Sequence, residues 1–223
     1  MERELGGADV DTRRRSAATL LRALCAYFEP QVTSVCLAWI GKEMTLFSSN
    51  PSANWRNKDT AIVLASALAT RSTISAAGTV EVNSLVNVQQ ILIDHVIPAI
   101  ADPNGNAILQ SDSIKFALSF RGVVSADAIR ATVPVLVQQL GNKNQVVHTF
   151  AAFALDRIMS IKGQNKMTPE AIGGLATADK ILESLFAIFV INGQEARKVA
   201  ENSYAMQCTS MSFCDWTLTG FLQ

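Results

Sequence analysis

DTRRRSAATLLRALCAYF, residues 11–28, has the residue spacing of an amphipathic α-helix. Its apolar residues recur at steps of three and four, which places them on one face: Ala17, Leu20, Leu21, Leu24, Cys25 and Phe28. Asp11 or Thr12 can cap the first backbone N–H groups. One amphipathic helix cannot bury its apolar face alone. We therefore expect this face to pack in a core formed with a partner helix.

A second helix follows directly and has the same apolar spacing. Pro30 fits the first position of that helix, and the apolar residues that continue the period are Val32, Val35, Cys36, Trp39, Ile40 and Phe47. We expect a tight turn at Glu29-Pro30 that joins the two helices into a hairpin. The same pattern predicts helix pairs at about 11–48, 54–100, 107–140 and 145–191, then a partial pair at 194–207.

Caps and prolines refine these bounds. Asn54 is predicted to cap the second pair, whose return helix is expected at 84–100 after a polar linker from Arg71 to Asn83. Pro98 should bend or shorten the end of that helix, and Pro134 lies inside the next return helix. Thr168-Pro169-Glu170 has the residues of a helix start, although Gly173-Gly174 allows a start near Thr177 instead.

The pairs form a repeat. Ala17-Ala18 precedes Leu21 as Ala151-Ala152 precedes Leu155, and Ala61 lies 44 positions after Ala17 and 90 before Ala151. A helix pair every 40–47 residues or so is typical of HEAT repeats, which stack into a superhelix. We therefore predict an all-α, HEAT-repeat (armadillo-like) superhelix of about four helix pairs plus a degraded fifth. Residues 1–207 are predicted to form one solenoid segment, followed by a divergent tail at 208–223.

Composition excludes several classes of function. The 19 basic and 19 acidic side chains give zero net charge, which does not support general nucleic-acid binding. The N-terminus lacks the apolar core of a signal peptide, and the apolar run near Ile181–Ile191 is about half of the ~20 residues that a membrane span needs. We expect no membrane insertion. Cys25 and Cys36 are predicted to be free, buried thiols in a reducing compartment.

No enzyme, cofactor or metal site is predicted. His95 and His148 are interpreted as structural or partly exposed, because neither lies near a nucleophile motif. No phosphate-binding glycine loop and no Cys/His metal spacing occur. The turn Asp102–Asn106 lacks the glycine position and the final acidic ligand of a calcium loop. We therefore predict no catalytic residue, no cofactor and no metal.

Arg13, Arg14 and Arg15 form the densest basic cluster and are the candidate partner-binding residues. They can be a solvated helix face, in part packed along the neighbouring repeat, or a contact for an acidic partner. Trp55 is open to two interpretations as well. It can anchor a partner or cover the junction between adjacent repeats.

Several blocks resemble the central region of the importin-α re-exporters (the exportin-2, or cellular apoptosis susceptibility, proteins), a family of the importin-β superfamily. The blocks are DVDTRRR at 9–15, NPSANWRNKDTAI at 50–62, Lys115-Phe116 with Phe120-Arg121, and VVHTFAA at 146–152. The NPSANW…KD and VVHT…AA blocks are specific, since ordinary HEAT repeats do not share them. The resemblance covers about residues 8–207, and TSMSFCDWTLTGFLQ at 209–223 departs from it.

The resemblance implies a transport receptor rather than an enzyme. Such a receptor binds Ran in its GTP form together with importin-α in the nucleus, and releases its cargo in the cytoplasm. It implies shuttling between nucleus and cytoplasm and leaves contacts with nuclear pore proteins open. Family chains are several times longer, so we expect this sequence to be a fragment that lacks N-terminal repeats. The alternative is a generic HEAT scaffold of the phosphatase or vesicle-coat type.

Overall fold

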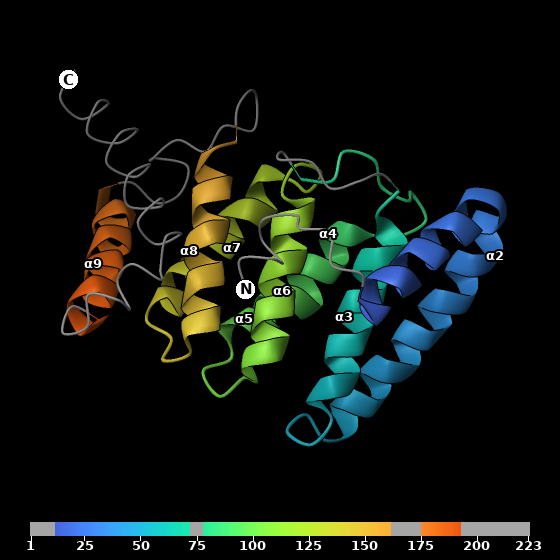
Figure 1. Ribbon diagram of the computed structural model, residues 1–223, viewed down its shortest axis with the longest axis horizontal. Coiled ribbons are helices and arrows are strands. Elements are labelled where there is room, and N and C mark those ends of the chain that lie inside the picture. Colours follow the sequence, from blue (N-terminus) through green and yellow to red (C-terminus); the bar gives the residue numbers. More distant parts are fainter. Residues whose placement is uncertain (1–11, 72–77, 162–174, 193–223) are drawn as a thin grey trace. The chain divides into compact units, whose positions relative to one another are not determined.

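The described part of the chain, residues 12–71, 78–161 and 175–192 of a computed structural model, is built from helices (Figure 1). An isolated antiparallel β-bridge joins Thr70 to Val82. The predicted all-α class is therefore confirmed for these residues. The predicted cap at Thr168-Pro169-Glu170, the partial pair at 194–207 and the tail at 208–223 lie outside them. The chain divides into two compact units, Met1–Val88 and Gln89–Gln223.

The first unit begins with helix α2 (Arg13–Ser49), which is broken once. Phe28 has non-helical angles, φ −132° and ψ 39°, and the blue ribbon of α2 turns back along its length in Figure 1. The cause is Pro30, which has no N–H to donate and whose ring crowds the preceding turn. The two helices predicted on either side of Glu29-Pro30 are therefore present, with the break slightly earlier than expected.

The predicted burial of the first helix face is wrong. Leu20 is 61% exposed and Phe28 56%, and Ala17 and Leu24 are exposed as well, whereas Leu21 and Cys25 are half-buried. In the second half of α2, Ile40 is buried but Trp39 is 52% exposed. Within this unit α2 packs on α3, so one narrow strip of each half is covered. The remaining width of the apolar face lies at the surface.

Helix α3 (Trp55–Ala69) starts at the predicted position but is capped differently. Asn54 occupies the N-cap, yet its side-chain amide donates to the carbonyl oxygen of Leu46 at 2.8 Å instead of accepting from the first turn. Asn50 accepts from the Ala53 N–H at 3.2 Å. The amide side chains therefore fasten the connection back onto α2. One face of α3 is buried at Ala61, Ile62, Ala65 and Leu68, while Leu64 is half-buried.

The return helix predicted at 84–100 begins later and is not uniform. It consists of α4 (Val88–Ile91), the π-helical turn η1 (Leu92–Val96) and α5 (Ile97–Ala101). The Ile97 N–H bonds to the carbonyl of Leu92, five residues back. The next residue, Pro98, has no N–H, and we attribute the widened turn to it. The predicted distortion near Pro98 is therefore present, as a change of helix type.

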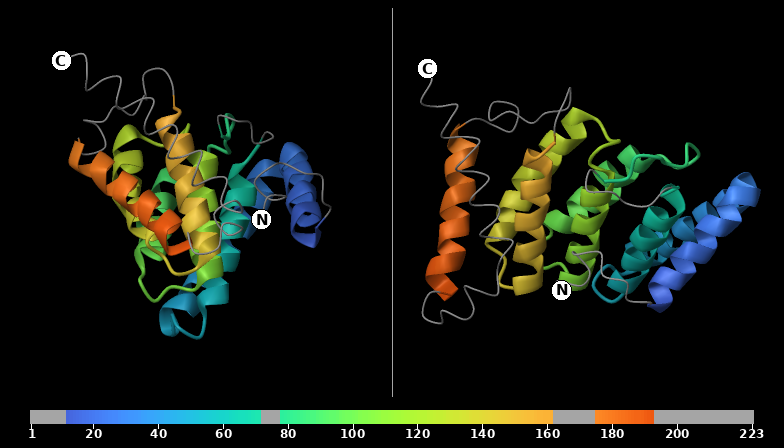
Figure 2. Two further views of the ribbon diagram at one scale, coloured as in Figure 1. Left: turned by 60° about the vertical axis from the view of Figure 1, so that its left-hand side comes forward. Right: turned by 45° about the horizontal axis from the view of Figure 1, so that its top comes forward.

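The second unit continues with α6 (Ala107–Phe120), α7 (Ala126–Leu140), α8 (Gln145–Met159) and α9 (Leu175–Asn192). Asn106, Ser125 and Asn144 accept hydrogen bonds from the first turns of α6, α7 and α8. Helix α6 contacts α8, while α5 contacts α7 and α7 contacts α9. First helices thus form one layer and return helices the other, as both views show (Figures 1 and 2). This two-layer order is that of stacked helix pairs.

Buried amides join the ends of these helices. Gln139 of α7 donates to the carbonyl of Ile100 at 2.7 Å, and Asn142 donates to the side chains of Gln139 (2.7 Å) and Gln110 (3.3 Å). Buried polar groups are costly unless they are paired. The network therefore fixes how α5, α6 and α7 meet at their connecting turns. Its hydrogen bonds join side-chain amides to one another and to a backbone carbonyl.

Candidate partner-binding surface

The three arginines singled out in the sequence occupy the first turn of α2. Thr12 caps this turn, its hydroxyl oxygen accepting from the Arg15 N–H at 3.2 Å. The N-terminal end of a helix carries partial positive charge, so cations there are unfavourable by roughly 0.3–1 kcal/mol each. This turn contains no acidic residue. Helix α2 therefore carries three positive side chains at an end where negative charge is favoured.

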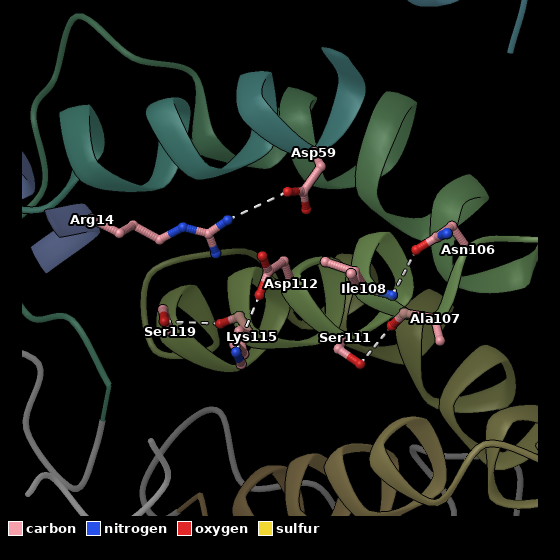
Figure 3. A network of polar contacts seen from close by, with 9 residues as sticks. All are labelled: Arg14, Asp59, Asn106, Ala107, Ile108, Ser111, Asp112, Lys115 and Ser119. Carbon is pink, nitrogen blue, oxygen red and sulfur yellow. Dashed lines mark hydrogen bonds and ion pairs between the residues drawn. The ribbon is translucent and has the colours of Figure 1, made fainter. Parts of the chain in front are cut away.

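The structure separates the three side chains by role. Arg14 Nη2 lies 3.5 Å from Asp59 Oδ2 of α3, in a contact that joins the two helices (Figure 3). The Asp59 side chain is 9% exposed and that of Arg14 58%. Arg13 and Arg15 are exposed. The predicted cluster thus consists of three exposed arginines, of which Arg14 also contacts Asp59 of α3.

The first turns of α3 fasten the same region from the other side. Asn57 donates to Glu43 at 2.6 Å, and the Lys58 ammonium lies 4.8 Å from the centre of the Phe47 ring. These residues belong to the block at 50–62, and their contacts hold α3 against the second half of α2. Trp55, the first residue of α3, is half-buried, and the Arg56 guanidinium lies 5.1 Å from the centre of its ring.

A second charged cluster, which sequence reasoning missed, lies where α6 meets α8. Lys115 Nζ is 3.1 Å from Asp112 Oδ1 (Figure 3). It also lies 4.8 Å from the centre of the Phe150 ring, so it links an acidic group to an aromatic face. Arg157 lies 5.0 Å from the Phe153 ring centre. The i, i+3 spacing of Asp112 and Lys115 was the available signal. Nothing in the sequence alone showed that both helices are buried on most sides.

Burial perturbs the ionisable groups of this cluster. Desolvation lowers the pKa of Arg121, and the neighbouring positive charge of Arg157 lowers it further. Desolvation raises the pKa of Asp156, which Arg157 opposes. Arg121 also donates to the carbonyl of Leu118 at 2.6 Å. Arg157 therefore disfavours the positive charge of Arg121 and favours the negative charge of Asp156.

The two histidines are placed as structural residues. His148 is buried in the first turn of α8, and its Nδ1 lies 3.1 Å from the carbonyl oxygen of Asn142, a contact that requires the proton on Nδ1. Desolvation lowers the pKa of His148. His95 lies in η1 and is half-buried. Cys25 and Cys36 are free and only half-buried, so their predicted full burial is wrong.

The described residues contain no group of three or more His, Cys, Asp or Glu side chains that could hold a metal ion. Likewise, among those residues no helix is both long and apolar enough to cross a bilayer.

Comparison with known families gives a match over most of the chain. The family model described as Cse1 matches residues 1–155. Exportin-2 of Homo sapiens is 33% identical over 216 residues, and exportin-2 of Danio rerio is 34% identical over 214. These alignments cover 96% and 95% of this chain but 22% of each relative. The chain therefore spans about a fifth of the length of the curated relatives it matches.

A solved structure agrees with these sequence matches. The structure described as "The exportin Cse1 in its cargo-free, cytoplasmic state" has a TM-score of 0.77 and 29% sequence identity to this chain. The alignment covers 95% of this chain and 21% of that one. Together with the helix pairs described above, it confirms the predicted HEAT-repeat fold.

Proposed function

Since the chain belongs to the Cse1 family, we propose that it is a segment of a nuclear transport receptor that exports importin-α in complex with the GTP form of Ran. The relatives that it matches are exportins, a class of transport receptor. The generic scaffold considered from sequence is not favoured by these matches. In this proposal the chain binds proteins and performs no catalytic step, and the receptor shuttles between nucleus and cytoplasm.

The observation that carries this proposal is the match in sequence over 96% of the chain and in structure over 95% of it. Stacked helix pairs expose the same edge of each helix to one side, and such arrays grip other proteins along extended surfaces. A protein-binding role therefore fits the two-layer order of α5–α9. We also propose that residues 1–207 act as a single solenoid segment within the longer receptor.

Arg13 and Arg15 are proposed as the partner-facing members of the basic cluster. Both are exposed on the first turn of α2, and they occupy a helix end where cations are unfavourable. An acidic partner would compensate this cost, and exposed charges mainly accelerate and orient association. Arg14 is assigned a mixed role, because its guanidinium already lies beside Asp59.

The proposal is tested by exchange into a complete receptor. The aligned region of human exportin-2 is replaced by this chain, and the chimera is expressed in cells depleted of their own exportin-2. We expect importin-α, which accumulates in the nucleus without its exporter, to return to the cytoplasm. A chimera with normal abundance and a helical circular dichroism spectrum that leaves importin-α nuclear would contradict the function. Capture of a phosphatase or coat subunit, independent of the Ran nucleotide, would support the scaffold alternative.

A further inference from the structure

The serine that directly follows the three arginines of the basic cluster has the surroundings of a phosphate acceptor. In the whole sequence, Ser16 is the one serine or threonine with an arginine at both the second and the third position before it, Arg14 and Arg13. Basic-directed serine kinases bind arginines at these two positions through carboxylates of their own, because the planar guanidinium fork matches a carboxylate. The spacing is therefore that of an acceptor for a kinase of this class.

The structure leaves this serine open to an enzyme. Residues 12–17 are all exposed. Helical spacing places Ser16 on the same face of α2 as Leu20 and Tyr27, whose side chains are 61% and 84% exposed. A kinase binds its substrate segment in an extended conformation, so the start of α2 has to unwind. Because these residues cover little apolar surface, unwinding this end of the helix costs little free energy.

A second serine shows what the structure adds to the sequence pattern. Ser160 also has an arginine three positions before it, Arg157. It is half-buried at the C-terminal end of α8, and its hydroxyl donates to the carbonyl of Asp156 at 2.7 Å. Ser160 therefore has one arginine in place of two and a hydroxyl that is already engaged. It serves as the comparison for Ser16 within the same chain.

We propose that Ser16 is a phosphorylation site for a basic-directed serine kinase, with magnesium-bound ATP as the phosphate donor. The Oγ atom of Ser16 attacks the γ-phosphorus of ATP. A bond forms between this oxygen and the phosphorus, while the bond from the γ-phosphorus to the oxygen bridging to the β-phosphate breaks. ADP leaves with that oxygen, and the hydroxyl proton passes to the carboxylate base of the kinase.

The phosphate changes the charge of the surface formed by Arg13, Arg14 and Arg15. It carries about −1.5 to −2 charges at neutral pH, which offsets half or more of the positive charge of the three arginines. Arg13 lies three positions before Ser16 on the same helix face, so its guanidinium and the phosphate can pair. The first turn of α2 contains no acidic residue, and negative charge is favourable at a helix N-terminus. Phosphorylation should therefore leave the helix start intact while it removes basic surface.

The consequence for binding rests on the function proposed above for Arg13 and Arg15. If these arginines face an acidic partner, a phosphate beside them repels that partner and cancels the attraction that orients its approach. Phosphorylation of Ser16 is thus a switch that lowers the affinity of the receptor for this partner.

The first test asks whether the folded chain accepts the phosphate, with no partner present. The whole chain is incubated with magnesium-ATP and the catalytic subunit of cAMP-dependent protein kinase, a basic-directed enzyme. Phosphopeptides are mapped and followed in time by mass spectrometry, and a standard peptide substrate verifies that the kinase is active. We expect phosphorylation of Ser16 to approach one phosphate per chain, with an initial rate at least about tenfold above that at Ser160.

Two arginine variants show whether the kinase recognises this site through the cluster. Arg13→Ala removes the arginine three positions before Ser16 but keeps the contact of Arg14 with Asp59, and should lower the initial rate at least about tenfold. Arg130→Ala is the matched control, because Arg130 is an exposed arginine of α7, and should leave the rate unchanged. A folded chain that stays unphosphorylated at Ser16, or an Arg13→Ala variant modified as fast as the parent, would overturn the proposal.

The second test measures the effect on partner binding. The exportin chimera and its Ser16→Ala variant are treated with the same kinase, so that phosphates at other positions are common to both. We expect the treated parent to bind importin-α with RanGTP at least about threefold more weakly than the treated variant, and the difference to shrink as salt is added. Equal affinities at full phosphorylation of Ser16 would overturn the switch. Failure of the untreated chimera to bind would contradict the proposed function instead, because the first test measures the phosphorylation site without any partner.

Discussion

His148 illustrates at the scale of a single residue how burial sets a pH dependence. Desolvation lowers its pKa in the folded chain, whereas in the unfolded chain the pKa is ordinary, near 6.5. Below about pH 6.5 the unfolded chain therefore binds more protons, and the free energy of unfolding falls until the folded pKa is passed. Asp156, whose pKa is raised, acts in the opposite sense at lower pH, because its carboxylate is disfavoured in the folded chain.

We predict that His148→Gln reduces the loss of stability between pH 7.5 and pH 5.5. Glutamine can still donate to the Asn142 carbonyl but does not titrate, while Asp156 is unchanged. Urea unfolding at both pH values measures the difference in the free energy of unfolding. A variant that loses as much stability on acidification as the parent would show that His148 is not the group responsible.

The arginines give a second residue-scale prediction. Arg13→Glu with Arg15→Glu in the exportin chimera should weaken its binding to the complex of importin-α and RanGTP by about tenfold, and should make binding less sensitive to salt. The melting temperature should stay level or rise slightly, because acidic residues are favourable at a helix N-terminus. Titrations at several salt concentrations provide the measurement.

Lys143→Glu serves as the control for this charge change, because Lys143 is also exposed and lies in the connection between α7 and α8. It should alter binding less than the arginine pair does. Unchanged affinity of the arginine variant at every salt concentration would remove Arg13 and Arg15 from the partner surface.

At the scale of elements, two exposed prolines should have opposite effects. Pro30 lies where the second half of α2 begins, so its fixed φ restricts the unfolded chain at no cost to the helix. Pro134 lies inside α7, where its missing N–H leaves the Arg130 carbonyl without its helical donor. Pro30→Ala should lower the free energy of unfolding by ~0.4–1 kcal/mol.

Pro134→Ala should raise the free energy of unfolding, by up to ~3 kcal/mol. The backbone hydrogen bond to the Arg130 carbonyl can then form, and no packing is lost because residue 134 is exposed. Urea denaturation of both variants tests the pair. Destabilisation by Pro134→Ala would mean that α7 depends on the bend that the proline imposes.

Periodicity predicted the presence of the helices, and the third pair, expected at about 107–140, corresponds to α6 and α7 (Ala107–Phe120 and Ala126–Leu140). It could not predict burial in α2, because spacing shows which residues share a face but not how much of that face a neighbour covers. Asn54 was recognised as an N-cap from its residue type, yet the carbonyl of Leu46 competes for its amide. The π-helical turn at Leu92–Val96 follows from hydrogen-bond competition near Pro98 that spacing does not reveal.

Only part of the arrangement around the basic cluster can be predicted from the sequence. The run of arginines is visible in the sequence, but the ion pair of Arg14 with Asp59 joins residues 45 positions apart. The contact of Lys115 with Phe150 likewise depends on the packing of α6 on α8. Such long-range pairs are set by helix packing, which no local pattern encodes.

At the scale of the whole molecule, stability should depend on where each apolar side chain is covered. Leu136 of α7 is fully buried, whereas Leu20 of α2 is mostly exposed. Leu136→Ala should therefore cost ~2–5 kcal/mol, and Leu20→Ala less than about 0.5 kcal/mol. Both are the same chemical change in one chain and are compared by chemical denaturation. A large cost at Leu20 would mean that its side chain is covered in solution.

We propose that this chain is a segment of a receptor whose affinity for importin-α depends on the nucleotide bound to Ran. Its most direct test is a titration of purified importin-α into the exportin chimera with Ran loaded with a non-hydrolysable GTP analogue or with GDP. We predict at least tenfold tighter binding with the GTP analogue, as for unmodified exportin-2 measured in parallel. A helical chimera that binds importin-α equally with either nucleotide, or not at all, would contradict it.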